Sequence, residues 1–197
     1  MKKIFLVLFI MLFSMPIMAF DYNNYTDLKM GVFMPNDDED GLKDFDNGLS
    51  IGASFGHRIN QNFALEAGIE FNACKLSESE QGINIDIKTT TFSIPLTAKA
   101  IAPLSETANL YAGLGIGIYS TKIDLDVSSG GRSASDSAEG NCIGFHGVLG
   151  GEFKLQPTMA LFGELKFTKV EQDMDEPIDD NVEVGGTTAN FGLKFLF

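Results

Sequence analysis

The feature that most constrains this chain is a repeat of two residues between apolar side chains. From Phe63 to Ala73 every second residue is apolar, and the residues between them include Glu66 and Glu70. A period of two places the apolar side chains on one face of a β-strand, whereas a helix repeats every 3.6 residues. The alternation continues well beyond the usual strand length of about five or six residues. The sequence therefore predicts a long strand with one apolar and one polar face.

The same alternation recurs along most of the chain and predicts eight strands. They cover residues 28–34, 49–55, 63–74, 85–100, 110–119, 143–154, 161–167 and 190–197. Three connections are short, at 59–62, 102–109 and 155–158. The other four are mostly longer and polar, at 35–48, 77–82, 124–141 and 171–186. Short turns at one end and longer loops at the other are typical of an up-and-down membrane barrel.

Alternation alone does not say whether the apolar face points into the barrel, as in a soluble protein, or out into lipid. Strands of about 9 to 11 residues are long enough to cross a bilayer at a tilt. The polar face mixes glycine with charges of both signs, which suits a narrow interior filled by small side chains and ion pairs. The charged residues expected to face this interior are Glu66, Glu70, Glu152, Glu164, Lys166 and Lys194. We therefore predict an all-β, eight-stranded antiparallel transmembrane barrel.

The last predicted strand reads NFGLKFLF. Phe191, Leu193, Phe195 and Phe197 alternate with Asn190, Gly192, Lys194 and Leu196. A membrane barrel has to close, because lipid offers no hydrogen-bond partner to an open sheet edge. We expect this strand to pair with the first.

The first residues have the pattern of a secretory signal. Lys2 and Lys3 precede an uncharged apolar run, and Ala19 is a small residue where a signal peptidase would cut. An uncleaved anchor is the alternative, but Pro16 interrupts a run that is already short for a spanning helix. We predict a cleavable signal peptide at 1–19 and one barrel domain at 20–197.

The eight strands, the signal sequence and the alternating last strand resemble the small outer-membrane barrel family of the OmpA transmembrane-domain, OmpX and opacity-protein type. The resemblance implies a bacterial outer membrane, with both termini in the periplasm and four loops outside the cell. It also implies that the barrel-assembly machinery reads the last strand. The residues that would carry this assembly signal are Phe191, Leu193, Phe195 and Phe197.

The chain is acidic, with a formal net charge of −13 at pH 7. Such a charge repels nucleic acid and attracts cations. The spacing of Asn36, Asp38, Asp40 and Asp44 approaches that of a Ca²⁺ loop, but Asn47 stands where a bidentate Glu belongs. A solvated acidic loop and a weak divalent-cation site both stay open, and no cofactor is expected.

The histidines and cysteines give no catalytic pattern. His57 and His146 lack the His-x-Ser spacing of lipid A deacylases, and parity places His146 inside the barrel. Parity also places Cys74 and Cys142 inside, near the end with the longer loops. A disulfide between them would have to join strands three apart, beyond the Cα separation of about 7 Å that the bond allows. The candidate disulfide therefore requires a flattened mouth or a frayed strand.

Three functions stay open on the sequence. The first is a structural or surface-interaction protein, whose acidic loops at 36–47 and 171–183 meet cations, lipopolysaccharide-like headgroups or host molecules. The second is a narrow channel for ions or small apolar compounds, of the OmpW type. The third is a lipid A-modifying enzyme, which has the least support, so we expect no enzyme.

Overall fold

The computed structural model describes residues 23–36, 45–80, 83–129, 132–173, 181–183 and 185–197. The predicted signal peptide lies outside these residues. Among them, no helix is long and apolar enough to cross a bilayer. The strands are β1 (Asn24–Pro35), β2 (Gly48–Arg58), β3 (Phe63–Glu80), β4 (Ile83–Pro103), β5 (Ala108–Ser129), β6 (Arg132–Gln156), β7 (Met159–Lys169), β8 (Glu171–Asp173), β9 (Asn181–Glu183) and β10 (Gly186–Leu196).

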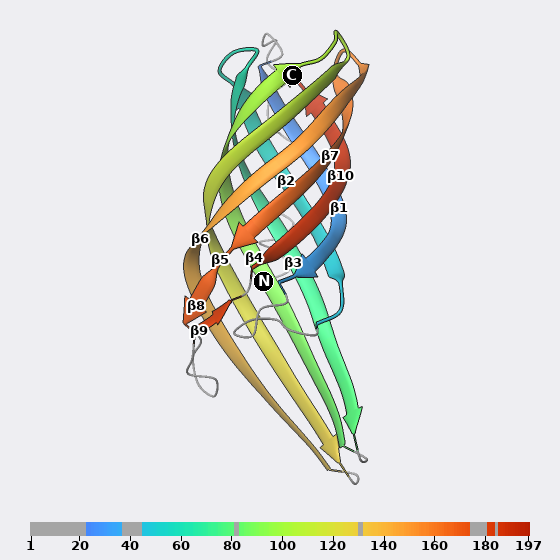
Figure 1. The fold of residues 1–197 in the computed structure, drawn as a ribbon, viewed down its shortest axis with the longest axis vertical. Coiled ribbons are helices and arrows are strands. Elements are labelled where there is room, and N and C mark those ends of the chain that lie inside the picture. Colours follow the sequence, from blue (N-terminus) through green and yellow to red (C-terminus); the bar gives the residue numbers. More distant parts are fainter. Residues whose placement is uncertain (1–22, 37–44, 81–82, 130–131, 174–180, 184) are drawn as a thin grey trace, which may run out of the picture.

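Eight of these strands close a barrel (Figure 1), in the order β1-β10-β7-β6-β5-β4-β3-β2. Neighbouring strands in the ring are antiparallel. β10 closes on β1, with Leu193 opposite Leu28 and Phe191 opposite Met30. The predicted eight-stranded fold and its closure are confirmed. β8 and β9 form a separate two-stranded sheet.

The apolar face of the barrel strands points outward. On β1, Leu28 and Met30 are about half exposed, at 54% and 48%. Asp27, on the other face of the same strand, is 1% exposed. Exposed apolar side chains around buried charges are the reverse of a soluble protein and are typical of a barrel surrounded by lipid.

Four neighbouring strands are much longer than the other four. β3, β4, β5 and β6 have 18, 21, 22 and 25 residues. β1, β2, β7 and β10 have 11 or 12. The additional length forms a four-stranded sheet that projects beyond the barrel at the bottom of Figure 1. We call this sheet the extension and define it as residues 73–80, 83–90, 122–129 and 132–139.

The extension corrects two predicted connections. The Ser/Gly-rich stretch at 124–141 was expected to be a loop, but β5 continues to Ser129 and β6 begins at Arg132. Likewise, most of 77–82 lies in strand, because β3 reaches Glu80 and β4 begins at Ile83. Pairing within a four-stranded ladder overrides the poor strand propensity of Ser, Gly and Asp, since propensity depends strongly on what a strand packs against.

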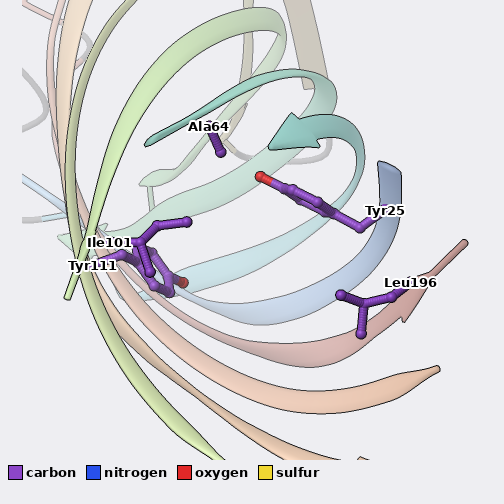
Figure 2. Close-up of a cluster of buried hydrophobic side chains, with 5 residues drawn as sticks. All are labelled: Tyr25, Ala64, Ile101, Tyr111 and Leu196. Carbon is purple, nitrogen blue, oxygen red and sulfur yellow. The ribbon is translucent and has the colours of Figure 1, made fainter. Parts of the chain in front are cut away.

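The end of the barrel with the short turns holds a cluster of buried apolar and aromatic side chains (Figure 2). Its members come from five strands: Tyr25, Ala64, Ile101, Tyr111 and Leu196. They lie near the first residues of β1, β3 and β5 and the last residues of β4 and β10. This cluster lines the lumen at the end opposite the extension.

Candidate functional site

The barrel interior contains ten charged side chains in the part of the chain that the structure describes, five of each sign. The acids are Asp27, Glu66, Glu70, Glu152 and Glu164, and the bases are Lys29, Arg58, Lys99, Lys166 and Lys194. These ten charges balance, so they contribute nothing to the formal net charge of −13.

Lys99 on β4 joins two carboxylates across the lumen. Its Nζ lies 2.8 Å from Glu66 Oε2 and 3.1 Å from Glu164 Oε2. β4 and β7, which carries Glu164, are three steps apart in the ring of strands. This contact therefore crosses the interior instead of following the wall.

A second bridge uses Glu70 on β3. Lys29 Nζ lies 2.6 Å from Glu70 Oε1, and Lys166 on β7 donates to Oε2 of the same carboxylate. β3 and β7 lie on opposite sides of the ring, four steps apart. Lys29 also approaches Glu164 at 3.5 Å, so the two bridges form one network. The network braces the barrel from wall to wall.

Glu152 organises a smaller group near the short-turn end. It accepts hydrogen bonds from Lys194 Nζ at 2.6 Å and from Asn109 Nδ2 at 2.7 Å, and it also pairs with Arg58. Lys194 Nζ lies 4.3 Å from the centre of the Tyr25 ring, within cation–π range. Each carboxylate oxygen of Glu152 thus has a charged donor.

Two tyrosines fill the space between these charges. The Tyr25 hydroxyl donates to Glu66 at 2.8 Å. The Tyr111 hydroxyl donates to Glu164 at 3.1 Å. Glycines make room for the rings. A Cβ at Gly56 would lie 2.0 Å from Tyr25 Cζ, and one at Gly150 would lie 2.4 Å from Tyr111 Cζ. The glycines of the polar face therefore serve close packing inside the lumen.

His146 faces the interior, as parity predicted. Its Nε2 lies 2.8 Å from Thr97 Oγ1 and its Nδ1 lies 3.2 Å from the Tyr119 hydroxyl. The ring is buried, with 4% exposed. Both nitrogens thus have hydrogen-bond partners within the barrel wall, which suits a structural role. His57, in contrast, is exposed and contacts Asn24 Oδ1 at 2.8 Å.

The polarity of the two faces inverts where the strands leave the barrel. On the outward face, the apolar row that includes Phe71 and Phe92 is followed by polar rows. These rows contain Lys75, Ser77, Asp86, Lys88, Lys122, Asp124, Asp126, Ser135, Ser137 and Glu139. Among the side chains that the structure describes, the inward face of the extension is mostly apolar, with Asp136 as a charged exception. It contains Leu76, Ile85, Ile87, Ile123, Leu125, Val127 and Ala138.

The apolar inward face is covered at its base. Ile123 packs with Tyr119 and Val170, and Ile87 packs against the same cluster. Ile123 and Val170 are buried, whereas Ile87 and the residues nearer the tips are partly exposed. Burial therefore decreases from the barrel rim toward the tips of the extension.

The six charged residues predicted from the sequence to face the interior are all buried there. The sequence prediction omitted Lys29 and Lys99, which link the carboxylates. A signal was present, since Lys29 alternates with Leu28 and Met30, and Lys99 lies between Ala98 and Ala100. The same parity rule would have placed both lysines inside.

The residues proposed as an assembly signal lie on the outward face of β10 and just after it. Phe191, Leu193 and Phe195 are exposed, and the Phe197 ring lies 6.3 Å from that of Phe55, centre to centre. Their recognition by the assembly machinery stays a prediction.

Another sequence candidate is the Ca²⁺ loop. Its residues Asp38, Asp40 and Asp44 lie outside the described residues, while the Asn36 amide donates to Gly185 O at 3.2 Å. Among the side chains that the structure describes, no group of three or more His, Cys, Asp or Glu residues is arranged to hold a metal ion.

The candidate disulfide is absent from the structure. Cys74 on β3 and Cys142 on β6 are both thiols, and their strands are three steps apart in the ring. Cys74 instead packs with Phe33 and Phe45.

The chain matches a known protein family over almost its whole length. Residues 5–195 match the family described as outer membrane protein beta-barrel domain. The chain belongs to this family. It is an integral β-barrel protein of the bacterial outer membrane. No curated protein matches the chain in sequence.

Several solved outer-membrane barrels share the fold of this family member. OprG from Pseudomonas aeruginosa matches with a TM-score of 0.62 and 14% identity, over 89% of this chain and 96% of that one. Neisserial surface protein A, NspA, matches with 0.59 and 14%, over 89% and 97%. Ail of Yersinia pestis matches with 0.51 and 19%, over 88% and 97%. At these identities the similarity concerns the fold alone.

Proposed function

We propose that this outer-membrane barrel is a surface-interaction protein that presents the extension outside the cell. The observation that carries this proposal is the inversion of polarity along β3 to β6. A polar outward face is unsuited to lipid, so the extension belongs in water beyond the bilayer. Its inward face leaves partly exposed apolar side chains, which water does not favour and which a partner would cover.

The interior supports a braced wall more than a channel. Lys166 and Glu70 meet across the full width of the ring, and Lys99 and Glu164 meet beside them. In a barrel of eight strands the interior is about wide enough for its own side chains. We therefore expect no general pore.

We further propose that the extension is extracellular and that the short turns are periplasmic, as the resemblance to small barrels implies. The acidic stretches at 36–47 and 171–183 would then face the outside of the cell and meet cations or host surface molecules. The hydrogen bond from the Asn36 amide to Gly185 O joins a residue that begins the first stretch to one that follows the second. Ail of Yersinia pestis has been solved in complex with the heparin analogue sucrose octasulfate, so a barrel of this fold can bind a sulfated sugar.

Orientation can be tested with single cysteines in a chain whose Cys74 and Cys142 are replaced by Ala. Ser128→Cys lies in the extension, and Glu106→Cys lies in the turn between β4 and β5. A membrane-impermeant maleimide should label Ser128→Cys on intact cells, and Glu106→Cys only after the outer membrane is permeabilised. The reverse pattern would contradict the proposed orientation.

The interaction itself can be tested by trimming the extension. Replacing 77–86 and 126–135 with two-residue turns removes its distal rows, because Ser77 pairs with Asp86 and Asp126 with Ser135. Full-length and trimmed proteins in nanodiscs would be compared on arrays of glycans and matrix proteins. Binding that disappears on trimming supports the proposal. Binding that is absent from the full chain, or unchanged by trimming, contradicts it.

Two measurements address the other functions. Planar-bilayer recordings of the full chain should show no conductance steps, and reproducible steps would favour the narrow channel. Lipid A from a strain lacking the protein should keep its mass, because we expect no enzymatic modification. A change in acylation that the restored gene reverses would instead indicate the enzyme.

A further inference from the structure

A hollow of about 480 Å³ opens on the barrel surface where β2 begins beside the lengthened β3. Its lining combines two chemistries. Leu49 and Ala73 contribute apolar surface. Polar groups come from Lys75, Ser77, Asp86, Lys88 and Asp126.

The hollow lies at the boundary between the apolar belt and the extension. Leu49 is 52% exposed on the outward face of β2 and is paired with Ala73 on β3. Lys75 follows Ala73 on the same outward face, with the first polar rows of the extension. One side of the hollow is therefore continuous with the lipid-facing surface, and the other faces the headgroup region.

Two lysines in the hollow lie directly opposite each other. Lys75 pairs with Lys88 in the β3–β4 ladder. Directly opposed Cβ atoms are about 5 Å apart, and like charges in that position are destabilising. Neither lysine forms an ion pair with a carboxylate that the structure describes. Two repelling cations beside an apolar surface are the arrangement expected for an anionic ligand.

The nearby acids do not neutralise these lysines. Asp124 is opposite Lys88 in the ladder, but its carboxylate pairs with Lys122 Nζ at 2.6 Å. Asp86 and Asp126 lie opposite each other one row farther from the barrel, and Asp86 accepts a hydrogen bond from Ser77 Oγ at 2.6 Å. Within the lining, the two lysines therefore lie in the row next to the apolar belt and the two acids in the row beyond it.

We propose that this hollow binds a phosphorylated glycolipid of the outer leaflet, of the lipid A type. Lys75 and Lys88 hold a phosphate, and Leu49 and Ala73 contact the beginning of an acyl chain. The volume exceeds that of a phosphate alone and admits part of the sugar that carries it. Lysines at a membrane surface favour anionic headgroups. The choice of an outer-leaflet glycolipid rests on the proposed extracellular orientation of the extension.

The test compares the native chain with the double variant Lys75→Gln/Lys88→Gln. Both would be inserted in phosphatidylcholine nanodiscs containing diphosphorylated lipid A, and bound lipid A would be measured by native mass spectrometry. We expect the double variant to bind about tenfold more weakly, because two phosphate contacts are lost. Lys154→Gln, near the last residues of β6 at the opposite end of the barrel, is the control that also removes a lysine, and its binding should be unchanged. A heat-modifiable band on unboiled gels verifies that every variant has folded.

Two further measurements test whether the phosphates of lipid A are what the hollow recognises. Lipid A stripped of both phosphates should bind as weakly to the native chain as the intact lipid does to the double variant. Phosphatidylglycerol in excess should not displace lipid A. Equal binding of stripped lipid A, complete displacement by phosphatidylglycerol, or an unaffected double variant would each overturn the proposal. Because both faces of a nanodisc are accessible, these results do not depend on the cysteine-labelling test of orientation.

Discussion

The extension continues four of the eight barrel strands but places its apolar residues on the opposite face. On β4, Ile94 and Leu96 point outward from the barrel, whereas Ile85 and Ile87 point inward from the extension. The change takes place without a break in the hydrogen-bonded ladder. One continuous strand thus presents its apolar side chains outward in the barrel and inward in the extension.

The two inner faces differ for a related reason. In the barrel the outward face contacts lipid, so the charged groups collect inside and have to neutralise one another. In the extension, which we propose to lie in water, charges remain on the outward face and apolar side chains collect inside. Lys99 accordingly lies buried between two carboxylates, while Lys122 pairs with Asp124 on an exposed surface.

The largest expected effect comes from breaking the buried network. Lys99→Met leaves Glu66 and Glu164 without one of their cations, and removing one member of a buried ion pair typically costs about 3–5 kcal/mol. The free energy of unfolding from lipid vesicles in guanidinium would measure this loss. The matched change in the extension, Lys122→Met, should leave that free energy unchanged, because exposed ion pairs contribute little. Similar losses in both variants would remove the contrast between the two regions.

A smaller effect is expected when one charge is added to the outward face of β6, either in the barrel or in the extension. Leu149→Lys places an ammonium against lipid and should lower the free energy of unfolding by about 2–4 kcal/mol if it lies near the bilayer midplane. Ser137→Lys introduces the same group on the outward face of the extension, opposite Asp124. It should be tolerated in the same vesicle assay. Equal destabilisation at both positions would place the extension inside the bilayer.

Removing one methyl group from β5 tests burial on the inward face of the extension. Ile123 is 8% exposed, so Ile123→Val should destabilise the extension by about 0.5–1.5 kcal/mol. Faster hydrogen exchange of the extension amides would report this change. Ile118→Val is the control on the lipid-facing surface, where the residue is 57% exposed and no faster exchange is expected. Unchanged exchange in both variants would mean that the inward face is not packed in solution.

The smallest effect concerns the two opposed lysines. Lys75→Gln removes the repulsion from Lys88 and should stabilise the protein by a few tenths of a kcal/mol in vesicles that contain only phosphatidylcholine. Unfolding curves in guanidinium at low salt would measure the gain, and added salt should reduce it through screening. Destabilisation by this substitution would show that Lys75 already has a favourable partner in the protein alone.

The barrel could be predicted from the sequence because its evidence is local. A period of two identifies a strand and assigns its faces without knowledge of its neighbours, which placed Glu66, Glu152 and His146 inside. The extension could not be predicted in this way. The segment around Ser133 and Ser135 has the composition of a loop. It forms a strand because β5 pairs with it, and β4 and β3 continue the same sheet.

The sequence by itself determined the eight alternating segments, the lipid-facing side of each and the closure of the last strand on the first. Only the tertiary structure decided which buried charges meet. Parity places Lys166 and Glu70 on the inside, but 96 residues separate them in the chain. Their contact depends on the strand order and stagger of the closed ring, which bring opposite walls within reach of one side chain. The extension was decided at the same level, because its ladder exists only when four consecutive segments pair.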